Sequence, residues 1–426
     1  MNQTTRRVAI VGGQRIPFAR AHSAYAEASN QDMMTAALKA LVDKTGIAGE
    51  RLGDVGLGAV IKNSRDFNLA RESVLGCGLD PHTPAFDVQR ACGTSLEAAI
   101  MIGNKIATGQ IESGIAGGVD SISGVPLVFS DKFRNIAMQS MRGKSMGDKL
   151  KPWLKLRPKD LKPQAPGVVE PRTHLSMGQH CELMAKEWKI PRAEQDELAL
   201  ASHKKAAAAW DSGFYDDLVT SYRGLERDNN VRGDSSLEKL STLKPAFDRE
   251  NGTLTAGNST PLTDGAAAVL LCSEEWAKAH KLEPIAYLTY GEVAAVDYVG
   301  KKEGLLMAPA YAVPRMLERA GITLQDFDLY EIHEAFAAQV LCTLKAWEDD
   351  TFCKERLGLD KALGSIDRKK LNLEGGSVAL GHPFAATGAR IIATLAKELQ
   401  TKKANRGLIS VCTAGGMGVT AILERA

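Results

Sequence analysis

The sequence lacks an excess of charge of either sign and a regular pattern of cysteines. Its 53 Lys and Arg residues are balanced by 51 Asp and Glu residues, which leaves a formal net charge of only +2. This balance gives no general electrostatic reason for binding nucleic acid. The seven cysteines are an odd number scattered through 426 residues, and no two have the CxxC spacing. We therefore expect neither a disulfide framework nor a structural zinc site, and the cysteine usage favours a reducing compartment.

Two further signals are missing near the start of the sequence. The apolar run 8–11 directly follows a pair of arginines and is too short for a signal peptide or a membrane-spanning helix. We predict that this run is a first strand and that the protein is cytoplasmic. A Gly-Gly pair follows the run, but the GxGxxG spacing of a dinucleotide-binding site is absent and Pro17 interrupts the segment.

The remaining composition, with 44% hydrophobic and 24% charged residues, is that of an ordinary soluble globular protein. A chain of 426 residues is long enough for two or three domain-sized units. Strand-like and helix-like segments alternate over the first 120 residues, with a helix predicted over 31–45 and strands over 55–61 and 114–119. This alternation predicts an α/β fold with a mostly parallel sheet covered by helices.

Cys92 lies at a predicted junction between a strand and a helix. Phe86 and Val88 alternate with polar residues, as in a half-buried strand, and after residue 95 apolar residues recur at steps of three and four. A thiol at the start of a helix experiences the positive end of the helix dipole and free N–H groups, which favour the reactive thiolate. A small buried hydrophobic side chain is the alternative, because that is the commonest environment of a free cysteine. The spacing alone does not decide between them.

Residues 121–249 differ in character from the segments on either side. Prolines interrupt the pattern and basic residues cluster, and helices are expected again only over 178–188 and 191–212. We predict that 121–249 is an inserted loop domain. The chain around it is then divided into an N-terminal half, 1–120 with 250–283, and a C-terminal half, 284–426.

The C-terminal half repeats the order of elements of the N-terminal half. A helix, a Gly-Ile pair and a strand occur near residue 46 and again near residue 321. The Cys92 helix and strand 114–119 likewise have counterparts in a helix over 387–399 and a strand over 407–412. The repeat indicates two related halves, with a coincidence between two α/β segments as the alternative.

Three other segments carry residues suited to catalysis: HEAF at His333, GGSVALGHP with His382, and CTAGGMG beginning at Cys412. Taken singly, each segment also has a purely structural explanation. The histidines could be hydrogen-bonded structural residues, and the glycine-rich turns could relieve backbone strain. Together with the Cys92 segment, they resemble the signature motifs of the thiolase family. Four separated motifs occur in the order of that family, and the resemblance extends over essentially the whole chain.

The resemblance implies a duplicated five-layer α-β-α-β-α architecture with an inserted loop domain. The HEAF segment is similar to the branch that contains bacterial fatty-acid oxidation thiolases and the β subunit of the trifunctional complex. The branch that forms acetoacetyl-CoA usually has Asn at the position of His333. Two residues depart from the family pattern: Ala414 replaces the first glycine of Cys-x-Gly-Gly-Gly, and Cys181 replaces an alanine. Ala414 keeps the backbone N–H that an oxyanion contact would need.

The resemblance also implies a two-step cleavage of a 3-ketoacyl-CoA by CoA. Cys92 would attack the 3-keto carbon, and His382 would accept the proton of Cys92. Cys412 would protonate the leaving acetyl-CoA enolate and then deprotonate the incoming CoA thiol. One oxyanion site would be formed by His382 and a water held by His333, and the other by the backbone N–H groups of Cys92 and Ala414. No metal or prosthetic group is required, since CoA and acyl-CoA are substrates.

For CoA binding, the resemblance implies the turn that follows residue 255. Phosphate contacts are expected from basic residues of the insert such as Arg232 or Lys239, although no motif selects among them. A homodimer or higher homo-oligomer is expected, and a hydratase/dehydrogenase α subunit is a possible partner. The expected CoA-binding residues are Ala256, Gly257, Ser259 and Thr260.

The segment 131–163 is strongly basic, with ten Lys and Arg residues against three Asp residues. Apolar residues are interleaved with these charges, a mixture that suits an anionic partner: CoA phosphates, an acidic subunit surface or lipid headgroups. A solvated loop over the active site is the alternative. Peripheral membrane contact is the weakest of these options, because Pro152 and Pro158 interrupt any long amphipathic helix. The resemblance favours docking of the α subunit.

Three other functions remain open at this point. An acetoacetyl-CoA-forming thiolase would share the chemistry. A condensing enzyme of the ketoacyl synthase type would share the duplicated fold, but it would need a second catalytic histidine where this chain has Cys412. A non-catalytic thiolase-like binding protein would not require the combination of Cys92, His382 and Cys412.

Overall fold

A mixed sheet of ten strands passes through the molecule in the computed structural model, which describes residues 5–164, 167 and 169–426. The strands lie in the order β4-β3-β5-β6-β1-β7-β10-β9-β8, and the short β2 pairs with β6. Their bounds are β1 Ala9–Arg15, β2 Ala19–Arg20, β3 Asp54–Leu57, β4 Ala85–Asp87, β5 Ser113–Asp120, β6 Thr263–Cys272, β7 Ala286–Ala295, β8 Leu329–Ile332, β9 Arg406–Thr413 and β10 Met417–Arg425.

The expectation of a mostly parallel sheet is wrong. Among the described strands, β3–β4, β3–β5 and β8–β9 are the parallel pairs, whereas the pairs at the centre of the sheet are antiparallel. The connections explain the difference. A tight turn joins β9 to β10, which requires an antiparallel pair, and the long insert between β5 and β6 allows β6 to return beside β5 in the opposite direction.

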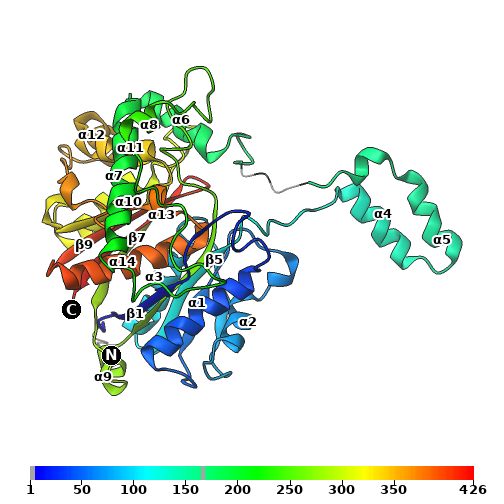
Figure 1. Ribbon diagram of the computed structural model, residues 1–426, viewed down its shortest axis with the longest axis horizontal. Coiled ribbons are helices and arrows are strands. Elements are labelled where there is room, and N and C mark those ends of the chain that lie inside the picture. The colour runs from blue at the N-terminus through cyan, green and yellow to red at the C-terminus, as the bar shows by residue number, and fades with distance from the viewer. Residues whose placement is uncertain (1–4, 165–166, 168) are drawn as a thin grey trace.

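Two helices, α3 and α14, lie between the two halves of the sheet and contact strands of both (Figure 1). Helix α1 covers the outer face of the N-terminal half, and α10 covers the outer face of the C-terminal half. The order from one side to the other is therefore helix, sheet, helix, sheet, helix. The α-helix bounds are α1 Asn30–Thr45, α2 Leu69–Gly76, α3 Thr94–Ala107, α4 Asp131–Arg142, α5 Met146–Leu150, α6 Met177–Glu187, α7 Arg192–Asp211, α8 Leu237–Ser241, α9 Glu274–Ala279, α10 Ala308–Ala320, α11 Ala337–Glu348, α12 Asp350–Leu357, α13 Ser377–Leu380 and α14 Thr387–Thr401.

The repeated order of elements that the sequence indicated is present. Helices α1 and α10 end in the same way, at Gly46 and Gly321, whose φ values of 68° and 65° lie in the left-handed region that favours glycine. Each helix leads to a short strand, β3 or β8, that pairs in parallel with the strand following a central helix. The two halves therefore place their central helices, α3 and α14, against each other in one apolar core.

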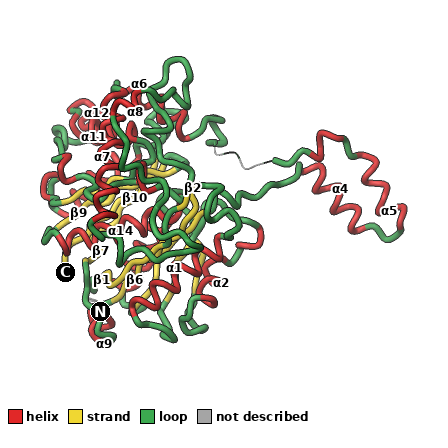
Figure 2. Tube along the Cα trace, viewed as in Figure 1, coloured by secondary structure: helices red, strands yellow, loops and turns green. Residues whose placement is uncertain are grey.

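The segment predicted as an insert, 121–249, consists of two structurally different parts. Helices α4 and α5, with the 3-10 turns Lys151–Lys155 and Pro158–Leu161, contact one another and reach away from the body as an arm (Figures 1 and 2). Helices α6 and α7 instead pack against α11, and α7 also contacts α13. The second part thus lies beside elements of the C-terminal half. No helix in the described part of the chain has the length and apolar character needed to cross a membrane.

Candidate active site

Cys92 lies in the short segment between β4, which ends at Asp87, and α3, which begins at Thr94. The Thr94 hydroxyl closes this turn. It accepts a hydrogen bond from the Arg90 N–H at 2.9 Å and donates one to the Ala91 carbonyl at 2.7 Å. Ala91 has a φ of 44°, a left-handed value that a residue with a side chain adopts only at a cost. The expected strand-to-helix junction is therefore present, and it holds the thiol beside a cavity.

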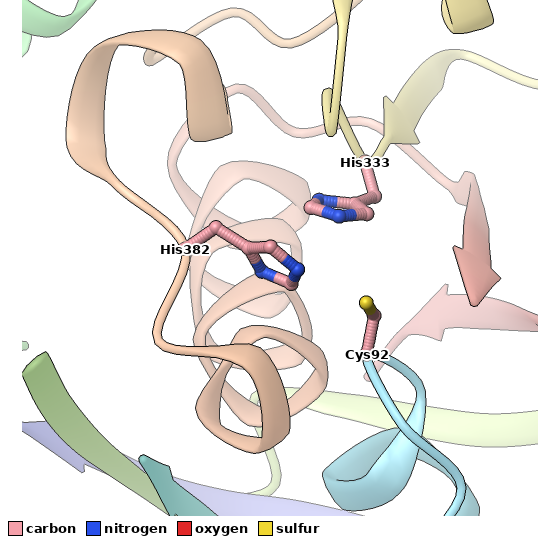
Figure 3. A group of neighbouring side chains, drawn as sticks. All are labelled: Cys92, His333 and His382. Carbon is pink, nitrogen blue, oxygen red and sulfur yellow. The ribbon is translucent and has the colours of Figure 1, made fainter. Parts of the chain in front are cut away.

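Cys92, His333 and His382 form one cluster, although they come from three distant parts of the chain (Figure 3). The Cys92 sulfur and one ring nitrogen of each histidine lie within 4.8 Å of one another, and the imidazole centroids are 4.2 Å apart. His333 directly follows β8, and His382 lies just after α13. The structure thus brings together three of the residues that the motifs selected.

Each imidazole is held through Nδ1 and leaves Nε2 free. His333 Nδ1 lies 2.8 Å from Ser377 Oγ, and His382 Nδ1 lies 2.5 Å from Thr387 Oγ1. Both Nε2 atoms are buried and make no hydrogen bond within the described protein. Burial lowers the pKa of His382 to about 3 and the pKa of His333 well below its usual value, and the positive charge of Arg390 acts in the same direction. Both rings are therefore neutral at neutral pH, so that an unprotonated ring nitrogen is available to accept a proton.

The helix start does not by itself lower the pKa of the Cys92 thiol. Burial raises the pKa of the Cys92 thiol to about 12, and the negative charge of Asp120 adds to this rise. The backbone N–H groups of Ala414 and of Cys92 itself act in the opposite direction but do not outweigh burial. The resting residue is therefore a thiol, and its attack requires a base that removes the proton.

Cys412 lies near the end of β9, close to Cys92. The residue is buried, and burial raises the pKa of its thiol well above the usual value, with a smaller contribution from Cys92. The next residues make the turn between β9 and β10, in which Gly415 and Gly416 have left-handed φ values of 77° and 70°. Ala414 has no positive φ, so the turn accepts an alanine at this position.

Glu170, a residue of the insert, anchors this turn by a hydrogen bond. The Gly415 N–H donates a hydrogen bond of 2.7 Å to the carboxylate of Glu170, which also accepts a bond of 3.0 Å from the Tyr298 hydroxyl. The Glu170 side chain is buried. It therefore positions the segment that presents the Ala414 N–H to the Cys92 sulfur.

A cavity of about 430 Å³ opens beside the Cys92 sulfur. Its lining is mainly apolar, with Ile61, Val169, Met177, Phe384 and Met417 among the residues that form it. A cavity of this size and character suits an aliphatic chain.

The two halves of the chain match known family models. Residues 8–275 match the model described as "Thiolase, N-terminal domain", and residues 282–425 match "Thiolase, C-terminal domain". The chain belongs to the thiolase family. The family resemblance inferred from the motifs is therefore confirmed.

Relatives of this thiolase include two bacterial proteins named 3-ketoacyl-CoA thiolase. The protein from Pectobacterium carotovorum is 46% identical over 98% of this chain and 96% of its own length. The protein from Yersinia pestis is 44% identical over 98% of this chain and 97% of its own length.

Solved structures of other thiolases show the same fold. An acetyl-CoA acetyltransferase from Bacillus anthracis is 30% identical, with a TM-score of 0.83 and full coverage of both chains. A human mitochondrial 3-ketoacyl-CoA thiolase in complex with CoA is 28% identical, with a TM-score of 0.81 over 99% of this chain and 98% of that one. The predicted thiolase-like α/β class is confirmed by this likeness.

A second cavity of this thiolase, of about 290 Å³, gathers most of the residues expected to bind CoA. Thr260 is not among its lining residues, and its hydroxyl donates a hydrogen bond of 2.7 Å to the Ser377 carbonyl. The Lys239 ammonium is paired with Asp234 at 3.0 Å. The expected residues that do line the cavity are Ala256, Gly257, Ser259, Arg232 and Lys239.

The cluster at Cys92 also contains groups that can ligate zinc, one thiol and two imidazoles. It is the one such group of three His, Cys, Asp or Glu residues found in the described part of the chain. A zinc ion would draw these ligand atoms to roughly 3.5 Å from one another and would occupy the thiol. Attack by a thiol with an imidazole base needs only proton transfer. That the protein requires no metal stays a prediction.

Reasoning from sequence missed several buried residues that position the site. The carboxylate of Asp120, at the end of β5, accepts backbone hydrogen bonds from residues 60, 61 and 385, at 3.0, 2.7 and 2.8 Å. Asp120 thus joins two walls of the Cys92 cavity, one at residues 60–61 and one at Ala385, which lies three residues after His382. A charged residue that ends a fully buried strand was the available signal. Ser377 belongs to a quoted motif, whereas nothing in the insert distinguished Glu170.

Proposed function

We propose that this chain is a 3-ketoacyl-CoA thiolase, an acetyl-CoA C-acyltransferase of fatty-acid β-oxidation. The observation that carries the proposal is the convergence of the Cys92 thiol with the unpartnered Nε2 atoms of two neutral imidazoles. The names of relatives at 44–46% identity support the 3-ketoacyl substrate class. His333 supports it as well, since the acetoacetyl-forming branch usually carries Asn there.

In the first half-reaction, Cys92 attacks the 3-keto carbon while its proton passes to His382. A neutral imidazole beside a thiol of raised pKa makes this a general-base step rather than an attack by a preformed ion pair. The former keto oxygen becomes an oxyanion next to the backbone N–H groups of Cys92 and Ala414. These groups already point at the sulfur in the resting structure.

Cleavage of the carbon–carbon bond leaves acetyl-CoA as its enolate. The enolate oxygen faces His382, now protonated, and a water held by His333. Cys412 supplies the proton to the carbanion, which fits a buried thiol that favours its neutral form. The Cys412 thiolate then takes the proton of the incoming CoA thiol, whose sulfur attacks the acyl-Cys92 thioester and releases the shortened acyl-CoA. The leaving Cys92 sulfur takes back the proton held by His382.

Each of the two cavities suits a different part of the substrate. The apolar cavity at Cys92 takes the acyl chain, and the cavity with the 256–259 turn takes CoA, with Arg232 the better placed cation for a phosphate because Lys239 is paired with Asp234. The human structure named as a complex with CoA supports a CoA site in this family. We further propose a cytoplasmic homodimer or higher oligomer.

We also propose that the arm contacts a partner subunit of hydratase/dehydrogenase type through an acidic surface. The arm stands away from the body, and many of its apolar side chains are exposed, with 77% of Met141 and 86% of Leu154 accessible. Four basic residues, called the tip cluster below, are also exposed. The tip cluster consists of Lys149, Lys151, Lys155 and Arg157.

The decisive experiment is acylation of the nucleophile. Incubation with acetyl-CoA should add one acetyl group, and peptide mass spectrometry should place it on Cys92. The Cys92→Ala variant should remain unmodified. Thiolysis of a long-chain 3-ketoacyl-CoA should then exceed thiolysis of acetoacetyl-CoA. An acetyl group found elsewhere, or no acylation of the folded protein, would refute the proposed function.

A further inference from the structure

Ser377 connects the His333 ring to a buried cation. Its hydroxyl oxygen lies 2.8 Å from His333 Nδ1 and 2.8 Å from Arg390 Nη2. Ser377 begins α13 and Arg390 belongs to α14, so two elements of the C-terminal half meet behind the imidazole. All three residues are at least 98% buried. No water or substrate from the outside competes for these contacts.

The directions of these hydrogen bonds follow from the donor hydrogens that need a partner. A guanidinium has only donor hydrogens, so the Ser377 oxygen accepts from Arg390. The Ser377 hydrogen is then free, and His333 Nδ1 is the acceptor that lies within reach in the described structure. If the Ser377 oxygen accepted from both Arg390 and His333, its buried hydrogen would have no partner, which is costly. We therefore assign the lone pair to His333 Nδ1. In a neutral imidazole the hydrogen must then be on Nε2, the nitrogen that faces the thiol and has no protein partner.

We propose that Ser377, oriented by Arg390, is a positioning residue that holds His333 in the Nε2–H form, so that a hydrogen-bond donor always faces the reacting oxygen. The inference rests on the proposed function, because the donor matters only if an oxyanion develops beside His333. It assigns the two histidines different tasks. His333 is a fixed donor, whereas His382 has to exchange a proton.

The environment of His382 supports this division. Its Nδ1 faces the Thr387 hydroxyl, to which no cation donates among the described contacts. Thr387 can therefore accept from an Nδ1–H, which leaves a lone pair on Nε2 for the Cys92 proton, or donate to Nδ1 when the ring changes form. Ser377 has less freedom, since it already accepts from Arg390 and its hydrogen has only His333 Nδ1 within reach among the described contacts.

Arg390 is itself a costly residue in this position. Its side chain is 1% exposed, and its nearest carboxylate, that of Glu331, is 3.5 Å away. Nε and Nη1 have no hydrogen-bond partner in the described protein. A buried guanidinium with such incomplete pairing destabilises the fold relative to an apolar residue. A positioning task at the active site gives a reason for its presence.

The first test determines which neutral tautomer His333 adopts in the unaltered protein. Long-range proton–nitrogen NMR spectra of histidine-labelled protein distinguish the two neutral forms of imidazole, and the His333→Asn variant identifies the signal. The proposal expects Nε2–H in the resting protein and a mixture of both forms in Ser377→Ala. Observation of Nδ1–H in the unaltered protein would overturn it. This readout does not depend on turnover, so it separates failure of the inference from failure of the proposed function.

The second test is a double-mutant cycle. Ser377→Ala should lower kcat by about 5- to 10-fold, the value of one hydrogen bond, with KM nearly unchanged. In the His333→Asn background, the same change should cost less than about 2-fold, because no imidazole remains to orient. Full additivity in the folded variants would overturn the proposal.

A matched control is available in Ser202. Its buried hydroxyl donates to Glu334 at 2.7 Å and accepts from the Gly376 N–H at 3.0 Å, one residue before Ser377. Ser202→Ala removes a comparable hydroxyl from the same region without a contact to either imidazole. Its effect should be the same with and without His333→Asn. Ser377→Thr, which keeps the hydroxyl, should restore the Nε2–H form.

Discussion

The carboxylate of Glu170 offers a direct test of the oxyanion turn. It lies in the insert and fastens the Gly415 N–H, next to the Ala414 N–H that we assign to the oxyanion site. In the Glu170→Ala variant the turn loses this anchor, and the Ala414 donor is no longer held at the sulfur. We expect slower acyl transfer from a protein that folds normally, because the lost contact lies at the surface of the cavity rather than in the apolar core.

The magnitude follows from the type of bond that is lost. A hydrogen bond from a backbone N–H to a charged acceptor is worth about 1.5–3 kcal/mol. If this free energy is felt fully in the transition state, kcat falls by about 10- to 150-fold, and the upper end of this range reaches the roughly 10²-fold lower limit for loss of a whole oxyanion donor. Glu170→Gln keeps an oxygen acceptor at the same place and should remain within about 3-fold of the unaltered protein.

The assay is the single-turnover rate of Cys92 acylation from acetyl-CoA, followed by quenching and mass spectrometry, together with kcat of thiolysis. Tyr298→Phe is the control, since it removes the other bond to Glu170, of 3.0 Å, and leaves Gly415 anchored. It should acylate at nearly the normal rate. An unchanged acylation rate in folded Glu170→Ala would refute the assignment of Ala414 to the oxyanion site.

Four further predictions follow from the site and the arm. Cys92→Ala should abolish acyl-enzyme formation, whereas Cys412→Ala should still acylate from a reactive thioester but lose carbon–carbon cleavage by roughly 10²–10⁴-fold; loss of acylation in both folded variants would contradict the separate roles. His333→Asn should retain measurable turnover and His382→Asn almost none, and equal complete loss would make His333 a direct proton carrier. The folded-state pKa of His382 is lowered to about 3, so its contribution to stability is present above the unfolded pKa and is lost as pH falls below it. The free energy of unfolding should therefore drop more steeply between pH 6.5 and 5 than in His382→Asn, by about 2 kcal/mol, and parallel curves in urea titrations would contradict this. Reversal of the tip cluster to Glu should weaken association with the proposed hydratase/dehydrogenase subunit and reduce the salt dependence of that association, while thiolysis by the isolated protein changes little. Intact association with weakened CoA binding would place the cluster at the nucleotide instead.

Local sequence patterns predicted the elements around the site well. Helix α1, the Cys92 junction, β5 and α14 lie within a few residues of their predicted places, because apolar periodicity and small residues act over short distances. The direction of strand pairing was predicted wrongly. Alternation of helices and strands does not report where the chain returns after a long insert, and β6 returns antiparallel to β5.

The catalytic side chains could be selected from motifs, but their electrostatics could not. The pKa of Cys92 depends on burial by segments some 300 residues away, which outweighs the local effect of the helix start. Positioning residues were harder still. The positioning role of Ser377 and Arg390 depends on the contacts of Ser377 with Arg390 and with His333. A single sequence gives no indication of these contacts.

The separation of the site residues along the chain has a consequence for synthesis. A ribosome releases Cys92 about 290 residues before His382 and about 320 before Cys412 and the Ala414 turn. During that interval the thiol lacks its base, its oxyanion donors and the wall that Asp120 fastens through Ala385. A nascent chain therefore holds Cys92 as an ordinary cysteine. The complete set of groups that we assign to acylation is therefore assembled only when the second half docks.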